Sequence, residues 1–429
     1  MWQRRLLPLI LNPILRISAN KTRKRRGIRD CAPFTGKEYR TKKYEHMIMT
    51  ASRDVLFGSG TTVAPLGLIA MSSVTELGDK INNYLVDWAG QGGLDVETFL
   101  IENECPRFSS GDGKGLIKST VRGKDLFIIV DVGNYNIKYD YFGMQNAMSP
   151  DDHFQDLKRI IQAASGKAHR INIIMPLLYG GRQHRRSYRE SLDCAFALQE
   201  LERMGVANLV TFDAHDPRVQ NAIPLMGFDN VMPTYQVLKA MLHDIKDLSF
   251  SKDKFMVVSP DEGALNRNMY YASVLGVEMG MFYKRRDYST IVNGRNPIVA
   301  HEYLGNPVEG KDVFVSDDII SSGESMLDLA YALKEKKAGR IFAYATYTIF
   351  TNGLEKFDEA YEKGIIDGVF GTNLTYRTPE LLSRPWFHEV DVSKYIAYFI
   401  EAINHDISIS NIIDPHEKIE SLLKEYGMK

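Results

Sequence analysis

Residues 312–325 read D-V-F-V-S-D-D-I-I-S-S-G-E-S, and the rest of the chain is interpreted outward from this stretch. The run 313–315 is apolar, as in a buried strand, and the adjacent carboxylates Asp317 and Asp318 follow it. The next segment, 321–325, is small and polar, and it precedes apolar residues at helical spacing: Met326, Leu329, Ala330 and Leu333. The pattern predicts a strand, a tight polar turn and the start of a helix.

A turn of this kind can hold a phosphate, because the first amide groups of a helix lack partners and the helix dipole is positive there. The two carboxylates cannot themselves ligate a phosphate. They suit the 2- and 3-hydroxyls of a ribose, either directly or through a divalent cation that prefers oxygen ligands. The alternative is an ordinary helix cap, since Asp-Asp followed by small polar residues also describes one.

The composition describes a globular protein with a large core. The chain has 429 residues, of which 44% are hydrophobic and 25% charged, and its formal net charge is −1. This balance gives no global reason to bind nucleic acid or a membrane, and the longest apolar run near the N-terminus, residues 6–15, is too short to span a bilayer. The three cysteines lack metal-type spacing, which favours a reducing compartment, and we expect a cytoplasmic protein.

Two α/β units follow a basic N-terminal arm. Residues 1–60 are rich in Lys and Arg, and we expect them to form a poorly ordered or dispensable arm; a targeting peptide and an upstream extension with no structural role are the alternatives. Beyond the arm, apolar runs alternate with helical patterns, which implies mainly parallel sheets flanked by helices. This rhythm restarts after Pro and Gly interruptions at residues 224–234. We therefore predict domains at 61–226 and 227–412, followed by a tail at 413–429.

Two charged clusters follow predicted strands of the first unit, at the edge where a parallel sheet places its chemistry. Arg182 and Gln183, with further arginines, follow a Gly-Gly turn; they suit phosphate or adenine contacts, although a solvated basic loop has the same composition. His215 lies in D-A-H-D at 213–216, where an extended chain would point Asp213 and His215 to the same side. A metal or phosphate contact and a structural histidine both fit this pattern.

Two more clusters follow strands of the second unit. Asp261, in S-P-D-E-G-A at 259–264, precedes a helix that carries Arg267, so it can hold Mg²⁺ or simply cap that helix. Lys284 and Arg286 lead into an aperiodic segment that is typical of a flexible loop. In a phosphate-transfer enzyme, such a loop would close over the reacting phosphates and neutralise their charge.

Taken in order, these motifs resemble the ribose-phosphate pyrophosphokinase family. The order R-Q, D-x-H, S-P-D-x-G, K-R-R and D-D-I-I-x-x-x-x-S, each after its own strand, is similar to that family, and the stretch 312–325 resembles its phosphoribosyl-binding loop. V-R-G-K-D at 121–125 and T-N at 372–373 add to the likeness. The resemblance implies an α/β fold of two consecutive type I phosphoribosyltransferase-like domains, each a mainly parallel sheet flanked by helices.

The resemblance also implies an enzyme of nucleotide biosynthesis. This diphosphokinase would transfer the pyrophosphoryl group of MgATP to the anomeric hydroxyl of ribose 5-phosphate, giving phosphoribosyl pyrophosphate and AMP. It would bind ATP, ribose 5-phosphate and Mg²⁺, and form homo-oligomers in which dimers assemble to hexamers. A catalytically silent regulatory homologue and a phosphoribosyltransferase using only the 317–325 loop are the alternatives. The set Lys284, Arg286, His215 and Asp261 argues against silence, and the presence of two α/β units argues against the transferase.

Each site role implied by the resemblance is assigned to matching positions. The catalytic cations are Lys284 and Arg286. The metal contacts are His215 and Asp261. The ATP contacts are Arg182, Gln183, Arg267, Ser110, Asp112 and Phe108, the last packing on the adenine of a neighbouring subunit. The ribose 5-phosphate contacts are Asp317, Asp318, Ser321, Ser322, Gly323, Glu324 and Ser325.

Several positions depart from the family pattern. Ser110 and Asp112 stand in place of aspartate and glutamate, His184 in place of aspartate, and Ala264 in place of glycine. Glu324 occupies a small-residue position of the phosphate loop. Because a helix N-terminus favours a negative side chain, we expect Glu324 to be a first-turn residue that faces away from the cradle.

Overall fold

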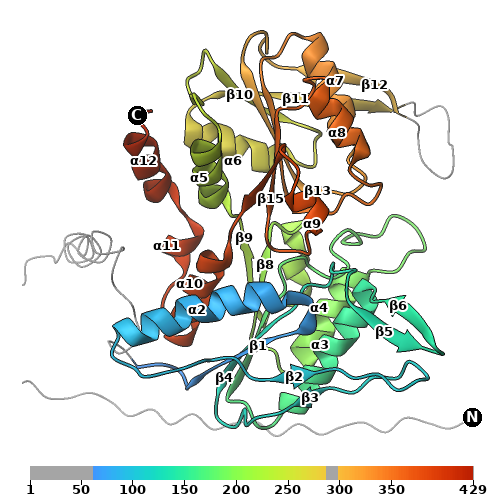
Figure 1. Cartoon of the computed structure of the whole chain (residues 1–429), viewed down its shortest axis with the longest axis vertical. Coiled ribbons are helices and arrows are strands. Elements are labelled where there is room, and N and C mark those ends of the chain that lie inside the picture. Colours follow the sequence, from blue (N-terminus) through green and yellow to red (C-terminus); the bar gives the residue numbers. More distant parts are fainter. Residues whose placement is uncertain (1–60, 287–297, 429) are drawn as a thin grey trace, which may run out of the picture. The chain divides into compact units, whose positions relative to one another are not determined.

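The structure, a computed structural model, describes residues 61–286 and 298–428, so the predicted basic arm lies outside the described residues. Two main sheets contain most of the strands (Figure 1). The first is five-stranded, in the order β1-β4-β7-β8-β9, and comprises β1 (Leu66–Ala70), β4 (Asp125–Ile129), β7 (Arg170–Ile174), β8 (Asn208–Phe212) and β9 (Gly227–Val231).

The second sheet is seven-stranded, in the order β12-β11-β10-β13-β14-β15-β16. Its strands are β10 (Phe255–Ser259), β11 (Glu278–Arg286), β12 (Ile298–Leu304), β13 (Asp312–Ile320), β14 (Ile341–Thr348), β15 (Gly368–Thr372) and β16 (Phe387–Val390). Neighbouring strands in both sheets are parallel, apart from the antiparallel pair β11 and β12. The predicted mainly parallel α/β class is therefore confirmed.

The two sheets repeat one topology. In the first, a small antiparallel pair, β2 (Asn103–Glu104) and β3 (Leu116–Ile117), lies between β1 and β4 in the sequence. In the second, the antiparallel pair β11 and β12 lies between β10 and β13. The order β1-β4-β7-β8-β9 therefore recurs as β10-β13-β14-β15-β16, which matches the predicted pair of consecutive, similar domains.

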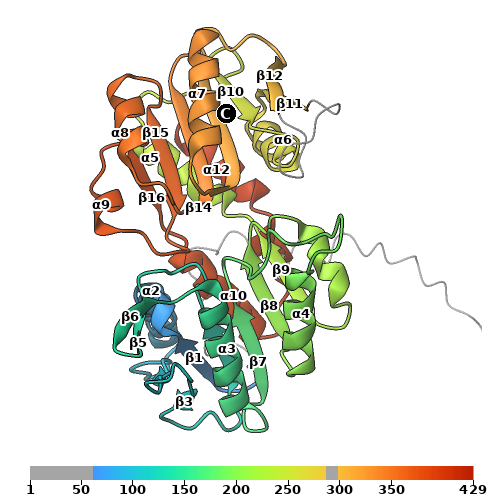
Figure 2. The same cartoon turned by 90° about the vertical axis from the view of Figure 1, so that its right-hand side faces the viewer.

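Helices cover both faces of the first sheet (Figure 2). One face packs on α3 (Pro150–Ala164) and α4 (Asp193–Arg203) through a core that includes Ile128, Ile173 and Leu198. The other face packs on α2 (Thr75–Gln91) and α10 (Ser393–Asn404), with Phe127, Ile129 and Phe399 in the core. Strands β1, β4, β7 and β8 are largely buried, which explains why they are mainly apolar in the sequence, whereas the edge strand β9 is only partly buried.

The second sheet is covered in the same way. On one face lie α7 (Glu324–Glu335) and α8 (Glu355–Glu362), and on the other lie α5 (Thr234–Asp244), α6 (Leu265–Leu275) and α12 (His416–Glu425). Shorter elements of the described part include the hairpin β5 (Lys138–Tyr141) with β6 (Met144–Ala147), α9 (Pro379–Leu382) and α11 (Ser410–Ile413).

Long-range contacts cross the predicted domain boundaries. Strand β9 pairs with β8, so the first sheet continues past the predicted boundary at residues 226 and 227. Helix α10, late in the sequence, covers the first sheet, and its Asn404 donates to the buried Asp125 carboxylate at 3.0 Å. The predicted tail contains α12, whose Ile419, Leu422 and Leu423 are buried against the second sheet. Local composition could not show these pairings.

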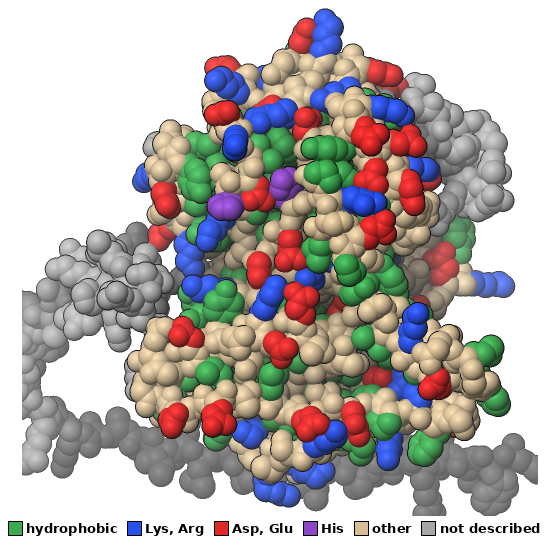
Figure 3. Space-filling view, in the orientation of Figure 1, with side chains coloured by type: hydrophobic (Ala, Val, Ile, Leu, Met, Phe, Trp, Pro, Cys, Tyr) green, Lys and Arg blue, Asp and Glu red, His purple; other side chains and the backbone are tan. Residues whose placement is uncertain are grey.

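Two surface properties bear on partners. No helix in the described ranges combines the length and apolarity needed to cross a membrane. On the face seen in Figure 3, basic and acidic side chains are interspersed.

Candidate active site

The acidic pair lies inside a strand. Strand β13 runs on to Ile320, so Asp317 and Asp318 are strand residues and do not follow the strand as the sequence predicted. Asp318 is buried, and its Oδ2 lies 2.7 Å from Nδ1 of His215. Burial alone would raise the pKa of Asp318, but the hydrogen bond from His215 and the charge of Arg267 outweigh it and lower the pKa. Burial and the Asp318 charge raise the pKa of its neighbour, Asp317.

The phosphate-type turn follows directly. Gly323 has φ +80°, and a Cβ there would lie 2.3 Å from Cε2 of Phe357, so both the conformation and the space require glycine. The carbonyl of Ser321 accepts from the amide of Thr351 at 2.8 Å, which ties the turn to the segment after β14. Helix α7 begins at Glu324 without a side-chain cap, which leaves its first amide groups available to an anion.

Glu324 is directed away from this turn. Its carboxylate accepts from Nζ of Lys356, on α8, at 2.7 Å. It does not line the cavity that the other turn residues line. The expectation that Glu324 is a first-turn residue facing away is confirmed, and its assignment as a ribose 5-phosphate contact is not supported by this geometry.

The loop after β8 contacts residues of the second sheet and of α6. Asp213 has φ +45°, so the chain is not extended there, and the prediction that Asp213 and His215 point to the same side on an extended chain was wrong. Asp213 is buried and accepts from Arg267 and, at 2.7 Å, from Thr346. His215 instead reaches Asp318, and that hydrogen bond raises the pKa of His215.

Asp261 and Arg267 lie where α6 begins. Oδ1 of Asp261 accepts from the amides of Gly263 and Ala264, at 2.9 and 3.2 Å, so the capping alternative describes one of its roles. Arg267 is held by Asp213 and lies 3.5 Å from Asp317, which makes it a bridge between carboxylates as well as a cavity residue. The sequence indicated no such pairing, because the partners are far apart along the chain.

Ten of the predicted site residues converge on one cavity of about 1030 Å³. They are Arg182, His215, Asp261, Arg267, Asp317, Asp318, Ser321, Ser322, Gly323 and Ser325. The cavity is also lined by residues to which the sequence analysis assigned no role, including His184, Arg185, Asp216, Arg218, Asn266 and Tyr283. His184 was visible in the sequence only as a departure; its ring centroid lies 5.3 Å from that of His215, and burial lowers its pKa.

The remaining predicted residues lie elsewhere. Nε2 of Gln183 donates to the carbonyls of Arg185 and Ser191, and the residue does not line the cavity. Phe108 is 57% exposed, and Ser110 donates to Asp112 at 2.8 Å in the same outlying loop.

The predicted catalytic cations were expected in a flexible loop. Strand β11 extends to Arg286 and pairs with β12, so the backbone of Lys284 and Arg286 belongs to an antiparallel strand pair. The structure describes the backbone of these two residues but not their side chains. Tyr283, one position before Lys284, lines the cavity.

The donor set fits a divalent cation that arrives with a phosphate ligand. Among the described residues, no three His, Cys, Asp or Glu side chains form a group that could hold a metal by itself. Asp261 contributes a carboxylate to the cavity and His215 an imidazole. Mg²⁺ typically binds one or two carboxylates and keeps waters and substrate phosphates as its other ligands, so a full protein cage is not required.

Comparisons with known proteins agree with this arrangement. The family model described as the N-terminal domain of ribose phosphate pyrophosphokinase matches residues 66–205, and the phosphoribosyl transferase domain matches residues 229–374. Over 309 residues the chain is 29% identical to the ribose-phosphate pyrophosphokinase of Vibrio cholerae and 30% identical to that of Shewanella oneidensis, covering 71% of this chain and 88% of each relative.

A solved structure shares the fold. The phosphoribosylpyrophosphate synthetase of Mycobacterium smegmatis superposes with a TM-score of 0.63 at 20% identity, over 80% of this chain and 99% of that one. The predicted two-domain architecture is therefore confirmed. The two domain matches and the 30% identical relative show that the chain belongs to the ribose-phosphate pyrophosphokinase family.

Proposed function

We propose that this chain transfers the pyrophosphoryl group of ATP to the anomeric hydroxyl of ribose 5-phosphate, giving phosphoribosyl pyrophosphate and AMP. One observation carries the proposal. The acidic pair Asp317 and Asp318 and the uncapped start of α7 open into the same cavity as Arg182, His215 and Asp261. A ribose-phosphate cradle and groups suited to nucleotide phosphates thus share one space.

The chain's own residues act mainly by positioning. The amides and hydroxyls of 321–325 would hold the 5-phosphate, and the acidic pair would hold the ribose hydroxyls. Arg182 would bind the nucleotide phosphates, so that the anomeric oxygen faces the β-phosphorus in line with the departing AMP. Asp261 and His215 would hold Mg²⁺, which would supply positive charge beside the phosphate oxygens. Lys284 and Arg286 would stabilise the charge that develops on the transferred group.

The test follows both products. Purified protein is incubated with ribose 5-phosphate, ATP, MgCl₂ and phosphate, and AMP and phosphoribosyl pyrophosphate are quantified together. We expect equal amounts of the two. No AMP across varied metals and nucleotides would contradict the proposal and favour the silent homologue. Turnover unchanged by Lys284→Ala would remove that residue from the mechanism.

We further propose a homo-oligomer in which Phe108, Ser110 and Asp112 complete the nucleotide site of a neighbouring copy. Their loop is exposed and lies away from the cavity of its own chain, which supports this role. Mixing inactive Phe108→Ala and Asp261→Ala proteins should restore part of the activity, because mixed assemblies then contain intact sites. No recovery, with exchange of subunits shown by native mass spectrometry, would contradict it. The free thiols of Cys105 and Cys194 suit the cytoplasmic location that we propose.

A further inference from the structure

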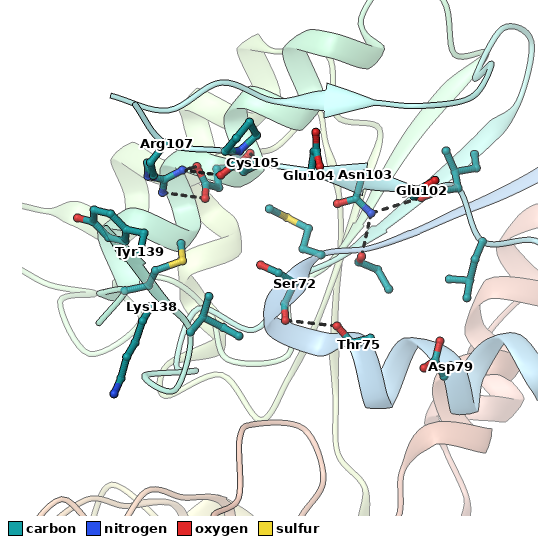
Figure 4. A pocket seen from close by; sticks show the side chains of 18 residues that line it. Ser72, Thr75, Asp79, Glu102, Asn103, Glu104, Cys105, Arg107, Lys138 and Tyr139 are labelled. Atoms are coloured by element: carbon teal, nitrogen blue, oxygen red, sulfur yellow. Dashed lines mark hydrogen bonds and ion pairs between the residues drawn. The ribbon is translucent and has the colours of Figure 1, made fainter. Parts of the chain in front are cut away.

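A second cavity, of about 650 Å³, lies beside the first sheet (Figure 4). Its wall is built by the segment after β1, the first turns of α2, strand β2 with the residues that follow it, and the start of β5. Cavities of this size accommodate small molecules, and open α/β sheets bind ligands beyond the carboxyl ends of their strands. None of the site residues predicted from the sequence lines this cavity.

Topology makes this cavity the counterpart of the candidate active site. The active-site cavity lies beyond β10 and β13 and takes Tyr283 from β11. The second cavity is lined by residues from the corresponding places in the first sheet. They are residues 70–72 at the end of β1, Asn103 and Glu104 of β2, and Ile137 and Lys138 after β4. Because the strand order repeats, β1, β2 and β4 correspond to β10, β11 and β13. The fold therefore forms the same kind of concavity twice.

The counterpart lacks a phosphate cradle. Helix α7 begins without a side-chain cap, whereas the corresponding helix, α3, begins with a complete capping box. Oγ of Ser149 accepts from the amide of Asp152 at 3.2 Å, and Oδ2 of Asp152 accepts from the amide of Ser149 at 2.9 Å. Two amide donors at this helix start are thus already used, and a carboxylate occupies the position.

The charge of the lining also disfavours a phosphate. Four carboxylates line the cavity, against two cations, Arg107 and Lys138; the carboxylates belong to Asp79, Glu102, Glu104 and Asp156. Glu102 and Glu104 pair with Lys118, at 2.7 and 3.2 Å. The guanidinium of Arg107 donates twice, at 2.8 Å, to the buried Asp156, which also accepts from Arg159 at 2.6 Å. The carboxylate of Asp79 makes no hydrogen bond or ion pair with another described residue, so it is available to a ligand.

The rest of the wall is largely apolar. It includes Met71, Ile101, Ile137, Met148 and the ring of Tyr139. Carboxylates beside apolar surface suit a molecule with a hydrophobic face and with hydroxyl or amino donors. We propose that this cavity binds a phosphate-free molecule of nucleoside size, which donates hydrogen bonds to Asp79.

Adenosine is the probe, and AMP, which is adenosine with a 5-phosphate, is the comparison ligand. The full-length chain is titrated by isothermal calorimetry in the presence of saturating ribose 5-phosphate and a non-hydrolysable ATP analogue, which occupy the active-site cavity. We expect adenosine to bind and AMP to bind at least about tenfold more weakly. Asp79→Asn should weaken adenosine binding by about tenfold, the loss expected for a hydrogen bond to a charged acceptor.

Asp87→Asn is the matched control. Asp87 is an exposed carboxylate on the same helix, outside the cavity, so its substitution should leave adenosine binding unchanged. Asp79 is exposed as well, so thermal unfolding should show that both variants fold. The proposal is overturned if adenosine fails to bind, if AMP binds equally well, or if Asp79→Asn behaves like Asp87→Asn.

Discussion

Arg267 and Asp213 form a buried ion pair that joins the two halves of the described chain. Nη2 of Arg267 lies 2.6 Å from Oδ1 of Asp213, and Nε lies 3.0 Å from both carboxylate oxygens. Nη1 of the same guanidinium lies 3.5 Å from Oδ1 of Asp317. The loop after β8 therefore holds the cation that faces the acidic pair on β13.

We expect Asp213→Asn to lower the free energy of unfolding by about 3–5 kcal/mol, because it leaves a buried guanidinium without its counterion. It should also raise the Kd for ribose 5-phosphate, since Arg267 no longer keeps its position beside Asp317. Urea unfolding and calorimetry measure the two effects. The double variant Asp213→Leu/Arg267→Met should recover much of the stability but not the binding. A single variant as stable as wild type would contradict the first expectation.

Gly323→Ala should reduce both stability and ribose 5-phosphate binding. The positive φ costs alanine about 1–2 kcal/mol, and contact with Phe357 adds to this cost and displaces the turn. Gly310→Ala is the control, since Gly310 has φ +71° but nothing within 4 Å of a Cβ. Gly310→Ala should lose only the stability that the positive φ costs alanine, and its ribose 5-phosphate binding should be unchanged. Equal effects of the two substitutions on binding would show that the turn tolerates a side chain.

Glu324→Gln tests the orientation of Glu324, whose negative charge would repel a phosphate if its side chain pointed into the turn at 321–325. Its carboxylate pairs with Lys356 at an exposed site, so removing the charge should leave the KM for ribose 5-phosphate within about twofold of wild type. Steady-state kinetics at several ribose 5-phosphate concentrations measure this. A marked fall in KM would mean that the charge of Glu324 repels the substrate phosphate, contrary to the observed geometry.

Asp131 should make stability depend on pH. Burial raises its pKa to about 6, although its carboxylate accepts from Thr375 and from the amides of Gly133 and Tyr376. The folded state therefore keeps a proton that the unfolded state releases near pH 4, so stability falls as the pH rises from about 4 to about 6 and stays lower above that. The total contribution is about 3 kcal/mol.

Asp131→Asn removes this titration. Unfolding free energies from urea denaturation at pH 4.5, 5.5 and 7 should therefore decline less steeply for the variant than for wild type. Parallel pH profiles for the two proteins would show that Asp131 is not the group responsible.

The sequence predicted features that depend on neighbouring residues. Apolar runs such as 313–315 and 341–348 became buried strands, because a parallel sheet covered on both faces needs continuous apolar segments. The turn at 321–325 was predicted because its small polar residues and glycine are what that conformation requires. The two carboxylates of β13 were also correctly expected near a helix start, although the strand extends beyond them.

Other features were decided by tertiary structure alone. The pairing of β9 with β8, the packing of α10 on the first sheet, and the Asp213–Arg267 pair join residues that are distant in sequence. Their stability comes from burial and from satisfied buried charges, which only the folded arrangement supplies. The sequence thus determined the local elements and the turn at 321–325, whereas long-range packing determined which side chains surround that turn.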